Sequence, residues 1–177
     1  IMAGANTVII DDPHLTCRYG GKGGKTRKQP LRVIVDGRGR IPATAQLFGE
    51  PGKVLLAVGE LASPEKKEAL AQAGAELLEL PSKEGLVDLK KLLEVLGERE
   101  ITSVLVEGGG ILLGSLFDDG LIDKVIAFIA PIIIGGKEAK TAVSGRGVDK
   151  VVNSFRLERI SVERFGDDLM VSGYVSA

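Results

Sequence analysis

Short runs of aliphatic residues alternate with segments of helical periodicity along the first two thirds of the chain. Aliphatic and β-branched runs bounded by glycine or proline are typical of buried strands, and apolar residues three and four apart are typical of one-sided helices. We expect strands at residues 1–3, 32–36, 54–58, 76–80, 103–106 and 124–130, helices at 63–73, 87–96 and 111–117, and a short helical piece before Pro13. This alternation predicts parallel strands joined by crossovers, which is an α/β fold.

The C-terminal tail has a different pattern, in which apolar residues take every second position. A period of two predicts an antiparallel hairpin with one buried face. We expect its strands at residues 162–165 and 169–176, on either side of a turn at 166–168. The predicted fold is therefore a mixed, mostly parallel central sheet flanked by helices, with a C-terminal antiparallel hairpin at one edge.

Composition then excludes several classes of protein. The chain has 177 residues, 44% of them apolar, and its 23 basic and 24 acidic residues nearly cancel. This favours one globular domain over residues 1–177 rather than a disordered chain or a polyelectrolyte binder. One cysteine and one histidine cannot make an internal disulfide or a closed zinc site, and they suit a reducing cytoplasm. The most apolar stretch, 125–134, is far shorter than the ~20 residues that span a bilayer, so we expect no membrane segment.

The strongest chemical signal is a turn of three glycines, Gly108, Gly109 and Gly110, between a predicted strand and a predicted helix. Bare backbone N–H groups at a helix N-terminus can cradle a pyrophosphate. Gly114 brings the spacing close to the dinucleotide fingerprint, but the next strand ends without the acid that would bind a ribose hydroxyl. If a dinucleotide binds here, either it carries a 2′-phosphate or the dinucleotide-binding fold is a different one. The alternative is a tight turn that binds no ligand. Glu107, just before the turn, either contacts a ligand or caps its own turn.

A second group of candidates lies between Asp11 and Arg18. Asp11 and Asp12 are adjacent and point in different directions, so we expect one to cap backbone and the other to be free to face a site. Arg18 either holds a phosphate through two hydrogen bonds or is a solvated loop residue. We expect His14 to be an exposed loop residue and Cys17 to be a small buried one.

A basic stretch runs from Arg18 to Arg32, with six positive charges, four glycines and no acid. It predicts a mobile loop and leaves a nucleotide-binding or RNA-contacting module as an alternative function. The chain contains no G-x-S-x-G, G-x-x-x-x-G-K-[ST], H-E-x-x-H or paired C-x-x-C motif. Nucleophilic, P-loop and zinc-hydrolase chemistries are therefore not expected.

Five motifs, in order along essentially the whole chain, resemble those of the reductase domain of riboflavin biosynthesis. They are Thr7-x-x-x-Asp11-Asp12-Pro13-x-Leu15-Thr16-x-Arg18, Gln29-Pro30-Leu31-Arg32-Val33-Ile34-Val35-Asp36, Val106-Glu107-Gly108-Gly109, Gly120-Leu121-Ile122-Asp123-Lys124 and Ala130-Pro131-Ile132-Ile133-Ile134-Gly135-Gly136. In bacteria this domain is usually the C-terminal half of a bifunctional pyrimidine deaminase and reductase, and in archaea and fungi it stands alone.

The resemblance implies a dihydrofolate reductase-like fold. It also implies that NADPH reduces the ribosyl chain of 5-amino-6-(5-phosphoribosylamino)uracil, or of its 2,5-diamino counterpart, to a ribityl chain. Carried over by position, the cofactor-binding residues are Thr7, Asp11, Gly37, Gly109, Gly110, Ile111, Leu112, Leu113, Gly114 and Ser115. The substrate-binding residues are Leu15, Arg18 and Glu107, with Arg18 on the phosphate. Asp11 is the candidate proton donor, and no metal is implied. Gly37 stands where the family often has serine, which removes one side-chain hydrogen bond to NADPH.

The resemblance also concerns what lies outside the chain. The family has a further strand and helix upstream, so we expect Ile1 to lie inside a strand of a longer protein, with a fused N-terminal deaminase domain as one form of it. The expected partners are the phosphorylated pyrimidine and a second copy in a homodimer, without nucleic acid or membrane, and the expected location is the cytoplasm. The choice between the deaminated and the diamino substrate stays open. Another dihydrofolate reductase-like NADPH reductase is the alternative among enzymes.

Overall fold

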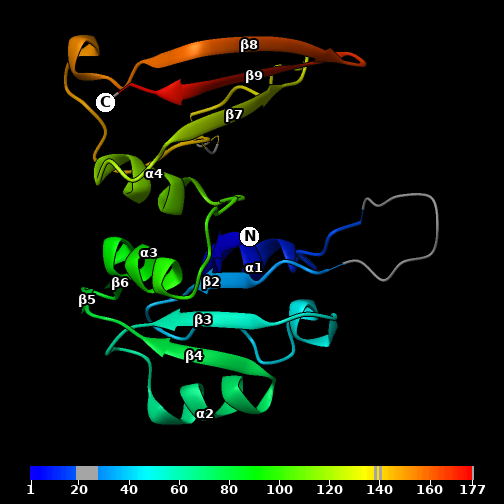
Figure 1. The fold of residues 1–177 in the computed structure, drawn as a ribbon, viewed down its shortest axis with the longest axis vertical. Coiled ribbons are helices and arrows are strands. Elements are labelled where there is room, and N and C mark those ends of the chain that lie inside the picture. Colours follow the sequence, from blue (N-terminus) through cyan, green and yellow to red (C-terminus); the bar gives the residue numbers. More distant parts are fainter. Residues whose placement is uncertain (19–27, 138, 140, 177) are drawn as a thin grey trace. The chain divides into compact units, whose positions relative to one another are not determined.

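The computed structural model describes residues 1–18, 28–137, 139 and 141–176 of the chain (Figure 1). The chain divides into two compact units, Ile1–Leu112 and Leu113–Ala177. A parallel sheet builds the first unit and an antiparallel sheet builds the second. The mixed α/β fold class is therefore confirmed, while a single domain over all 177 residues stays a prediction.

The parallel sheet of the first unit follows the order of the sequence. Its strands, each paired with the next, are β1 (Met2–Gly4), β2 (Arg32–Val35), β3 (Val54–Val58) and β4 (Ala75–Glu79). On the free side of β1, Met2 forms a parallel bridge with Val106. The strand predicted at 103–106 is thus present only as this one bridge, with two backbone hydrogen bonds that tie residues 105 and 107 to Met2.

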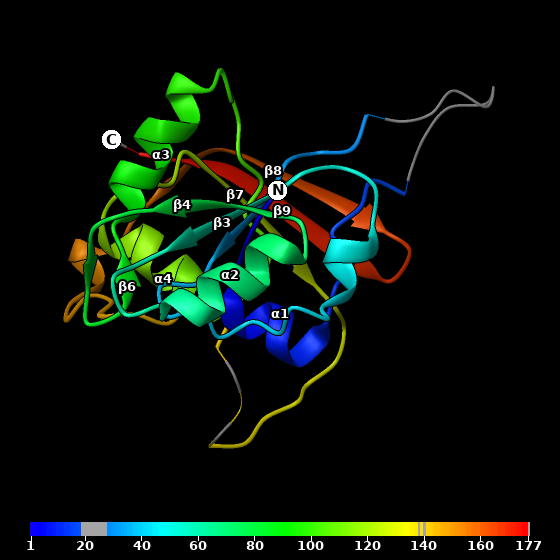
Figure 2. The same cartoon turned by 90° about the horizontal axis from the view of Figure 1, so that it is seen from below.

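Helices α1 (Ala5–Asp11) and α2 (Pro64–Gln72) follow β1 and β3. The N-terminus of α2 confirms the sequence prediction, since Pro64 is its first residue and Ser63 Oγ accepts a hydrogen bond from the Lys66 N–H at 3.4 Å. Helix α1 ends at Asp11 because Asp12 takes a left-handed conformation (φ 41°), ahead of Pro13. Figure 2 shows α1 and α2 on the same side of the sheet.

Helix α3 (Leu89–Glu98) covers the other side of the sheet (Figure 2). It starts two residues later than predicted, because Asp88 Oδ1 accepts a hydrogen bond from the Lys91 N–H at 2.9 Å and caps the helix. The residue before this cap, Val87, instead pairs with Ser82 in a small antiparallel hairpin, β5 (Ser82–Lys83) and β6 (Leu86–Val87). Sequence periodicity had missed this hairpin.

The core of the first unit lies on the α1–α2 side of the sheet, around β3, all five of whose residues are buried. The short 3-10 helix η1 (Gln46–Gly49) contributes Leu47, which is fully buried. The buried cluster contains Ala3, Ala5, Val8, Leu15, Ile34, Ile41, Ala45, Leu47, Val54, Leu56, Val58, Ala62, Leu70 and Ala75. This packing fixes α1 and η1 against the ends of the parallel strands.

In the second unit, three strands pair in the order β7-β9-β8, all antiparallel. They are β7 (Lys124–Ile129), β8 (Leu157–Phe165) and β9 (Asp168–Val175), and a second 3-10 helix, η2, covers Val151–Asn153. The C-terminal hairpin is confirmed, although β8 begins earlier than predicted and contains a bulge between Glu158 and Ser161. Burial does not alternate along β9 as expected, because the neighbours Ser172 and Gly173 are both buried.

Candidate functional site

The candidate site of the first unit lies at the carboxyl ends of its parallel strands. On one side of β1, the Glu107 N–H donates a hydrogen bond to the Met2 carbonyl at 2.9 Å. Glu107 and the glycines after it therefore leave the sheet at the edge where β1 runs into α1. Parallel sheets bind ligands outside their carboxyl ends, where connections diverge in this way.

The glycine turn contacts the first helix directly. Gly108 and Gly109 both take left-handed backbone conformations, with φ of 77° and 78°. A Cβ on either of them would lie 3.2 Å from Thr7 Oγ1 on α1. Glycine is thus favoured twice, by the positive φ and by an approach that would be tight for a Cβ. The structure brings Thr7 and Gly109 together, two residues assigned to the cofactor by resemblance, and α4 (Gly110–Asp118) begins immediately afterwards.

Gly37 lies at the end of β2, where the neighbouring backbone is closely packed. The buried carboxylate of Asp36 orders this turn, since its Oδ2 accepts a hydrogen bond from the Ile41 N–H at 2.8 Å. A Cβ on Gly37 would collide with the carbonyl of Gly85, in the turn between β5 and β6. Arg38 fixes the same turn through a 2.7 Å hydrogen bond from its Nη2 to the Glu84 carbonyl. The hairpin turn therefore fills the space that a side chain at position 37 would take.

We expect Gly37→Ser to destabilise the protein by about 1–3 kcal/mol, because the added side chain must displace backbone at Gly85. Denaturant unfolding monitored by circular dichroism measures the loss. Gly97→Ser is the matched control, because no atom lies within 4 Å of a Cβ there. Equal unfolding midpoints for the two variants would contradict the packing described for Gly37.

The segment from Asp11 to Arg18 leads away from α1. Asp11 is exposed at the last position of the helix, and Arg18 is exposed at the far end of the segment. Between them, Leu15 has a left-handed backbone (φ 51°) and a side chain only 9% exposed. Leu15 thus belongs to the core of the unit, and its assignment as a substrate contact stays a prediction. Residues 19–27 of the basic stretch that follows lie outside the described residues.

The contacts of Asp12 show which of the adjacent carboxylates, Asp11 or Asp12, caps backbone. Its Oδ1 accepts a hydrogen bond from the Gln46 N–H at 2.9 Å, and Oδ2 accepts one from Gln46 Nε2 at 3.0 Å. The backbone hydrogen bond from Gln46, followed by the side-chain one, lowers the pKa of Asp12. Asp12 is therefore the residue that caps backbone, which leaves Asp11 as the one able to face a ligand.

Of the two further expectations for this segment, the exposure of His14 is confirmed and the burial of Cys17 is not. His14 is exposed, as predicted, and its Nδ1 lies 2.7 Å from Glu50 Oε1. Cys17 is exposed rather than buried, which corrects the sequence prediction. The Cys17 N–H donates a 2.9 Å hydrogen bond to Gln29 Oε1, so the chain has returned to the surface two residues after Leu15.

The remaining cofactor candidates lie along α4. Ile111 is exposed, whereas Leu112 is buried and packs on Gly4, where a Cβ would lie 3.6 Å from Leu112 Cβ. Leu113, Gly114 and Ser115 belong to the second unit. There, a Cβ on Gly114 would collide with the Ser144 carbonyl. The packing of the 144–147 loop thus gives Gly114 a structural reason to be glycine, and the contact of residues 113–115 with a cofactor stays a prediction.

The loop against α4 is held by one carboxylate. Asp118 Oδ2 accepts a 2.7 Å hydrogen bond from the Arg146 N–H, and Oδ1 accepts one from the Gly147 N–H at 3.1 Å. The first of these lowers the pKa of Asp118. Among the described residues, no group of histidine, cysteine, aspartate or glutamate side chains is arranged to hold a metal ion, and no helix has the length and apolarity to cross a membrane.

Comparison with known proteins gives a consistent result. The family described as the RibD C-terminal domain matches residues 1–171. The 2,5-diamino-6-ribosylamino-4(3H)-pyrimidinone 5′-phosphate reductase of Methanothermobacter thermautotrophicus is 37% identical over 172 residues, which are 97% of this chain and 77% of that protein. The riboflavin biosynthesis protein RibD of Actinobacillus pleuropneumoniae is 33% identical, over 97% of this chain and 44% of that protein.

Solved structures agree with these sequence matches. RibD of Acinetobacter baumannii has a TM-score of 0.82 and 30% identity, over 99% of this chain and 46% of that one. A Thermotoga maritima protein, described as a diaminohydroxyphosphoribosylaminopyrimidine deaminase/5-amino-6-(5-phosphoribosylamino)uracil reductase, has a TM-score of 0.71 and 26% identity, over 99% of this chain and 44% of that one. The chain thus spans less than half of these bacterial proteins and about three quarters of the archaeal one.

Proposed function

We propose, from the premise that this chain belongs to the RibD C-terminal domain family, that it is a pyrimidine reductase of riboflavin biosynthesis. Its substrate would be 5-amino-6-(5-phosphoribosylamino)uracil or the 2,5-diamino form, its product the ribityl compound, and its reductant NADPH. The archaeal relative that carries the 2,5-diamino substrate in its name supports this reading. The structural observation that supports the proposed function is the close approach of Gly108 and Gly109 to Thr7, beside the end of β1.

The residues present suit a dinucleotide. Gly108 and Gly109 have no side chains to obstruct a pyrophosphate, and α4 begins directly after them, so its N-terminus follows the turn. NADPH, when bound, supplies the hydride for the reduction. The chain must then hold the sugar in line and provide a proton for the opened oxygen or the imine nitrogen.

Three side chains divide these tasks in the proposal. Asp11, exposed at the end of α1, gives the proton, directly or through water. Arg18 binds the 5′-phosphate, and Glu107, beside the glycine turn, holds the pyrimidine. Glu107 is hydrogen-bonded to β1 and Asp11 ends the helix that follows β1, so this strand relates the two positions.

The direct test is NADPH oxidation by the protein with each of the two pyrimidine forms, with NADH as the comparison. We expect NADPH-dependent formation of the ribityl product from at least one form. NADPH oxidation with neither pyrimidine but with another carbonyl or imine substrate would favour a different dihydrofolate reductase-like reductase. A salt-dependent gel shift with RNA and no NADPH binding would favour the nucleic-acid alternative.

Arg18→Ala should raise the KM for the phosphorylated substrate about 10-fold or more, because a charge-assisted hydrogen bond to phosphate contributes ~1.5–3 kcal/mol. The KM for NADPH should stay unchanged. Steady-state kinetics with each reactant varied in turn measures both. Arg164→Ala, which removes an exposed arginine near the β8–β9 turn, is the matched control. An unchanged substrate KM in Arg18→Ala would remove Arg18 from the phosphate site.

Assembly belongs to the same proposal. We infer a homodimer, which sedimentation of the purified protein would contradict if it gave a monomeric mass. A deaminase domain fused to this chain in the full protein fits the Thermotoga maritima relative, whose description names both activities. A cytoplasmic location stays a prediction from the sequence.

A further inference from the structure

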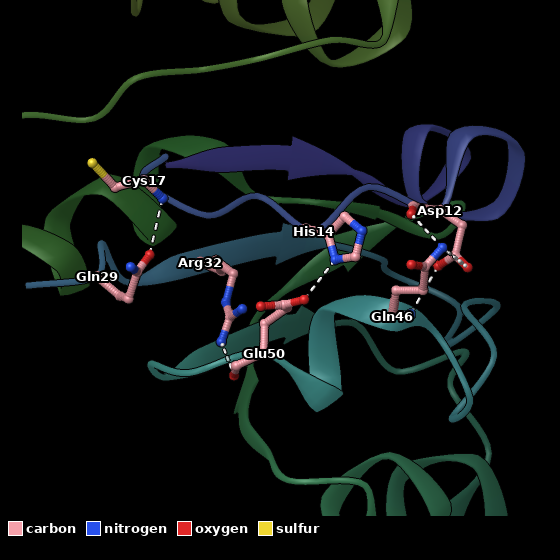
Figure 3. Close-up of polar contacts among 7 residues, drawn as sticks. All are labelled: Asp12, His14, Cys17, Gln29, Arg32, Gln46 and Glu50. Carbon is pink, nitrogen blue, oxygen red and sulfur yellow. Dashed lines mark hydrogen bonds and ion pairs between the residues drawn. The ribbon is translucent and has the colours of Figure 1, made fainter. Parts of the chain in front are cut away.

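Three side chains hold the segment between Asp11 and Arg18 on the surface of the first unit. Gln46 contacts Asp12, Glu50 contacts His14, and Gln29 contacts the backbone of Cys17, as Figure 3 shows. The shortest heavy-atom distance of each contact lies between 2.7 and 2.9 Å. All three partners come from the stretch 29–50, which contains β2 and the core residues Ile34, Ile41, Ala45 and Leu47. Every second or third residue of the segment is thus anchored to the body of the unit.

The first anchor joins Asp12 to Gln46, with Gln46 as the donor in each hydrogen bond. The Asp12 carboxylate accepts from both the backbone N–H and the side-chain amide of Gln46, and so caps the first residue of η1 from a distant part of the chain. The neighbouring Leu47 is fully buried, so η1 cannot move away without opening the core. Asp12 is thereby held where α1 ends, one residue after Asp11.

The second anchor begins at a buried arginine. Arg32, only 1% exposed, donates from Nη2 to the carbonyls of Glu50 at 3.0 Å and Gly52 at 2.9 Å. These hydrogen bonds tie the backbone after η1 to the start of β2. The Glu50 carboxylate then reaches His14 at 2.7 Å. The imidazole is therefore held by a residue that is itself fixed to the parallel sheet.

We propose that Gln46 and Glu50 are positioning residues of the reductase site, which set the distance between the proton donor Asp11 and the phosphate-binding Arg18. This inference rests on the proposed function and adds two residues to it, because neither carries a role by resemblance. Gln46 acts through Asp12, and Glu50 acts through His14. The anchored segment fixes the separation of two groups that the sugar phosphate must reach together, Asp11 at its opened oxygen or imine nitrogen and Arg18 at its 5′-phosphate.

The physical reason is the cost of ordering a surface segment during the reaction. Fixing one residue costs ~1–2 kcal/mol in backbone entropy, and an error of about 1 Å in the position of a bound substrate can cost about 100-fold in rate. Anchors formed during folding remove that cost from the catalytic step. They matter only for a substrate that contacts both ends of the segment, which a dephosphorylated pyrimidine does not.

The test compares Gln46→Ala in the full chain with two substrates, the phosphorylated pyrimidine and its dephosphorylated form. We expect the ratio of their kcat/KM values to fall about 10-fold, because Arg18 is no longer held at the distance of the phosphate. Gln72→Ala is the matched control, since Gln72 also donates to a carboxylate, that of Glu68 at 3.2 Å, but lies on α2. This control should leave the ratio unchanged.

Two further variants separate positioning from folding. Asp12→Asn can still accept from the Gln46 N–H, and its amide can pair with the turned-over side-chain amide of Gln46, so it should keep the ratio, whereas Asp12→Ala can form neither contact and should lose it. Combined with Arg18→Ala, Gln46→Ala should add no further loss, because both act on the phosphate. Equal losses with both substrates, or additive losses in the double variant, would overturn the positioning role. Absence of turnover by the unaltered chain with either pyrimidine would instead overturn the proposed function.

Discussion

Asp11→Asn should lower kcat by about 10²–10⁴-fold, the usual contribution of a placed proton donor, while the KM values for substrate and NADPH change little. Asparagine has nearly the shape of aspartate and still forms hydrogen bonds, but it cannot give up a proton. Asp11 is exposed and ends α1, so the substitution disturbs no packing and the fold should remain intact. Single-turnover kinetics with saturating NADPH measures the chemical step directly.

The matched control for Asp11→Asn is Asp167→Asn, which also removes one exposed carboxylate but lies in the turn between β8 and β9. Its kcat should equal that of the unaltered protein. If Asp11→Asn keeps kcat within a few-fold, the proton comes from water or from another residue, and Asp11 would then only bind the cofactor. A large rise in KM with constant kcat would lead to the same conclusion.

Gly109→Ala should weaken NADPH binding about 10-fold or more while substrate binding stays nearly constant. Alanine at a φ of 78° costs about 1–2 kcal/mol, and its Cβ would lie 3.2 Å from Thr7 Oγ1. The turn must therefore shift, and the shift moves the N–H groups proposed to face the pyrophosphate. Fluorescence titration with NADPH measures the change in affinity.

Gly74→Ala is the control for Gly109→Ala, because it introduces backbone strain without altering the proposed cofactor site. Gly74 also has a left-handed conformation (φ 103°), but no atom lies within 4 Å of a Cβ there, and it follows α2 instead of the bridge at Val106. Both variants should lose comparable stability in thermal unfolding, and only Gly109→Ala should lose NADPH affinity. Equal NADPH affinities in the two variants would exclude the glycine turn from the cofactor site.

The sequence predicted most of the elements because their signals are local. Helix α2 follows from Ser63 and Pro64, and the C-terminal hairpin follows from a period of two around Gly166. The glycine turn after Val106 was also evident, since consecutive glycines between a strand and a helix have few other uses. The short hairpin β5–β6 escaped because strands of two residues have no periodicity.

The candidate site could be predicted only in part, because its supports come from distant parts of the chain. Nothing near Gln46 or Glu50 in the sequence indicates contacts with residues 34 and 36 positions earlier. The exposure of Cys17 was missed for the same reason, since its hydrogen-bond partner Gln29 lies 12 residues later in the chain. Resemblance to a family identifies residues expected to contact ligands, whereas the residues that position those side chains are found only in the folded structure.

The close packing of Gly37 against the turn between β5 and β6 also bears on how this family can evolve. Relatives with serine at this position need a different backbone at the turn, and a chain with this turn needs glycine. We therefore expect the residue at position 37 and the length of the segment 82–87 to covary among homologues. A designed exchange of one without the other should give poorly expressed protein, and an exchange of both together should restore it.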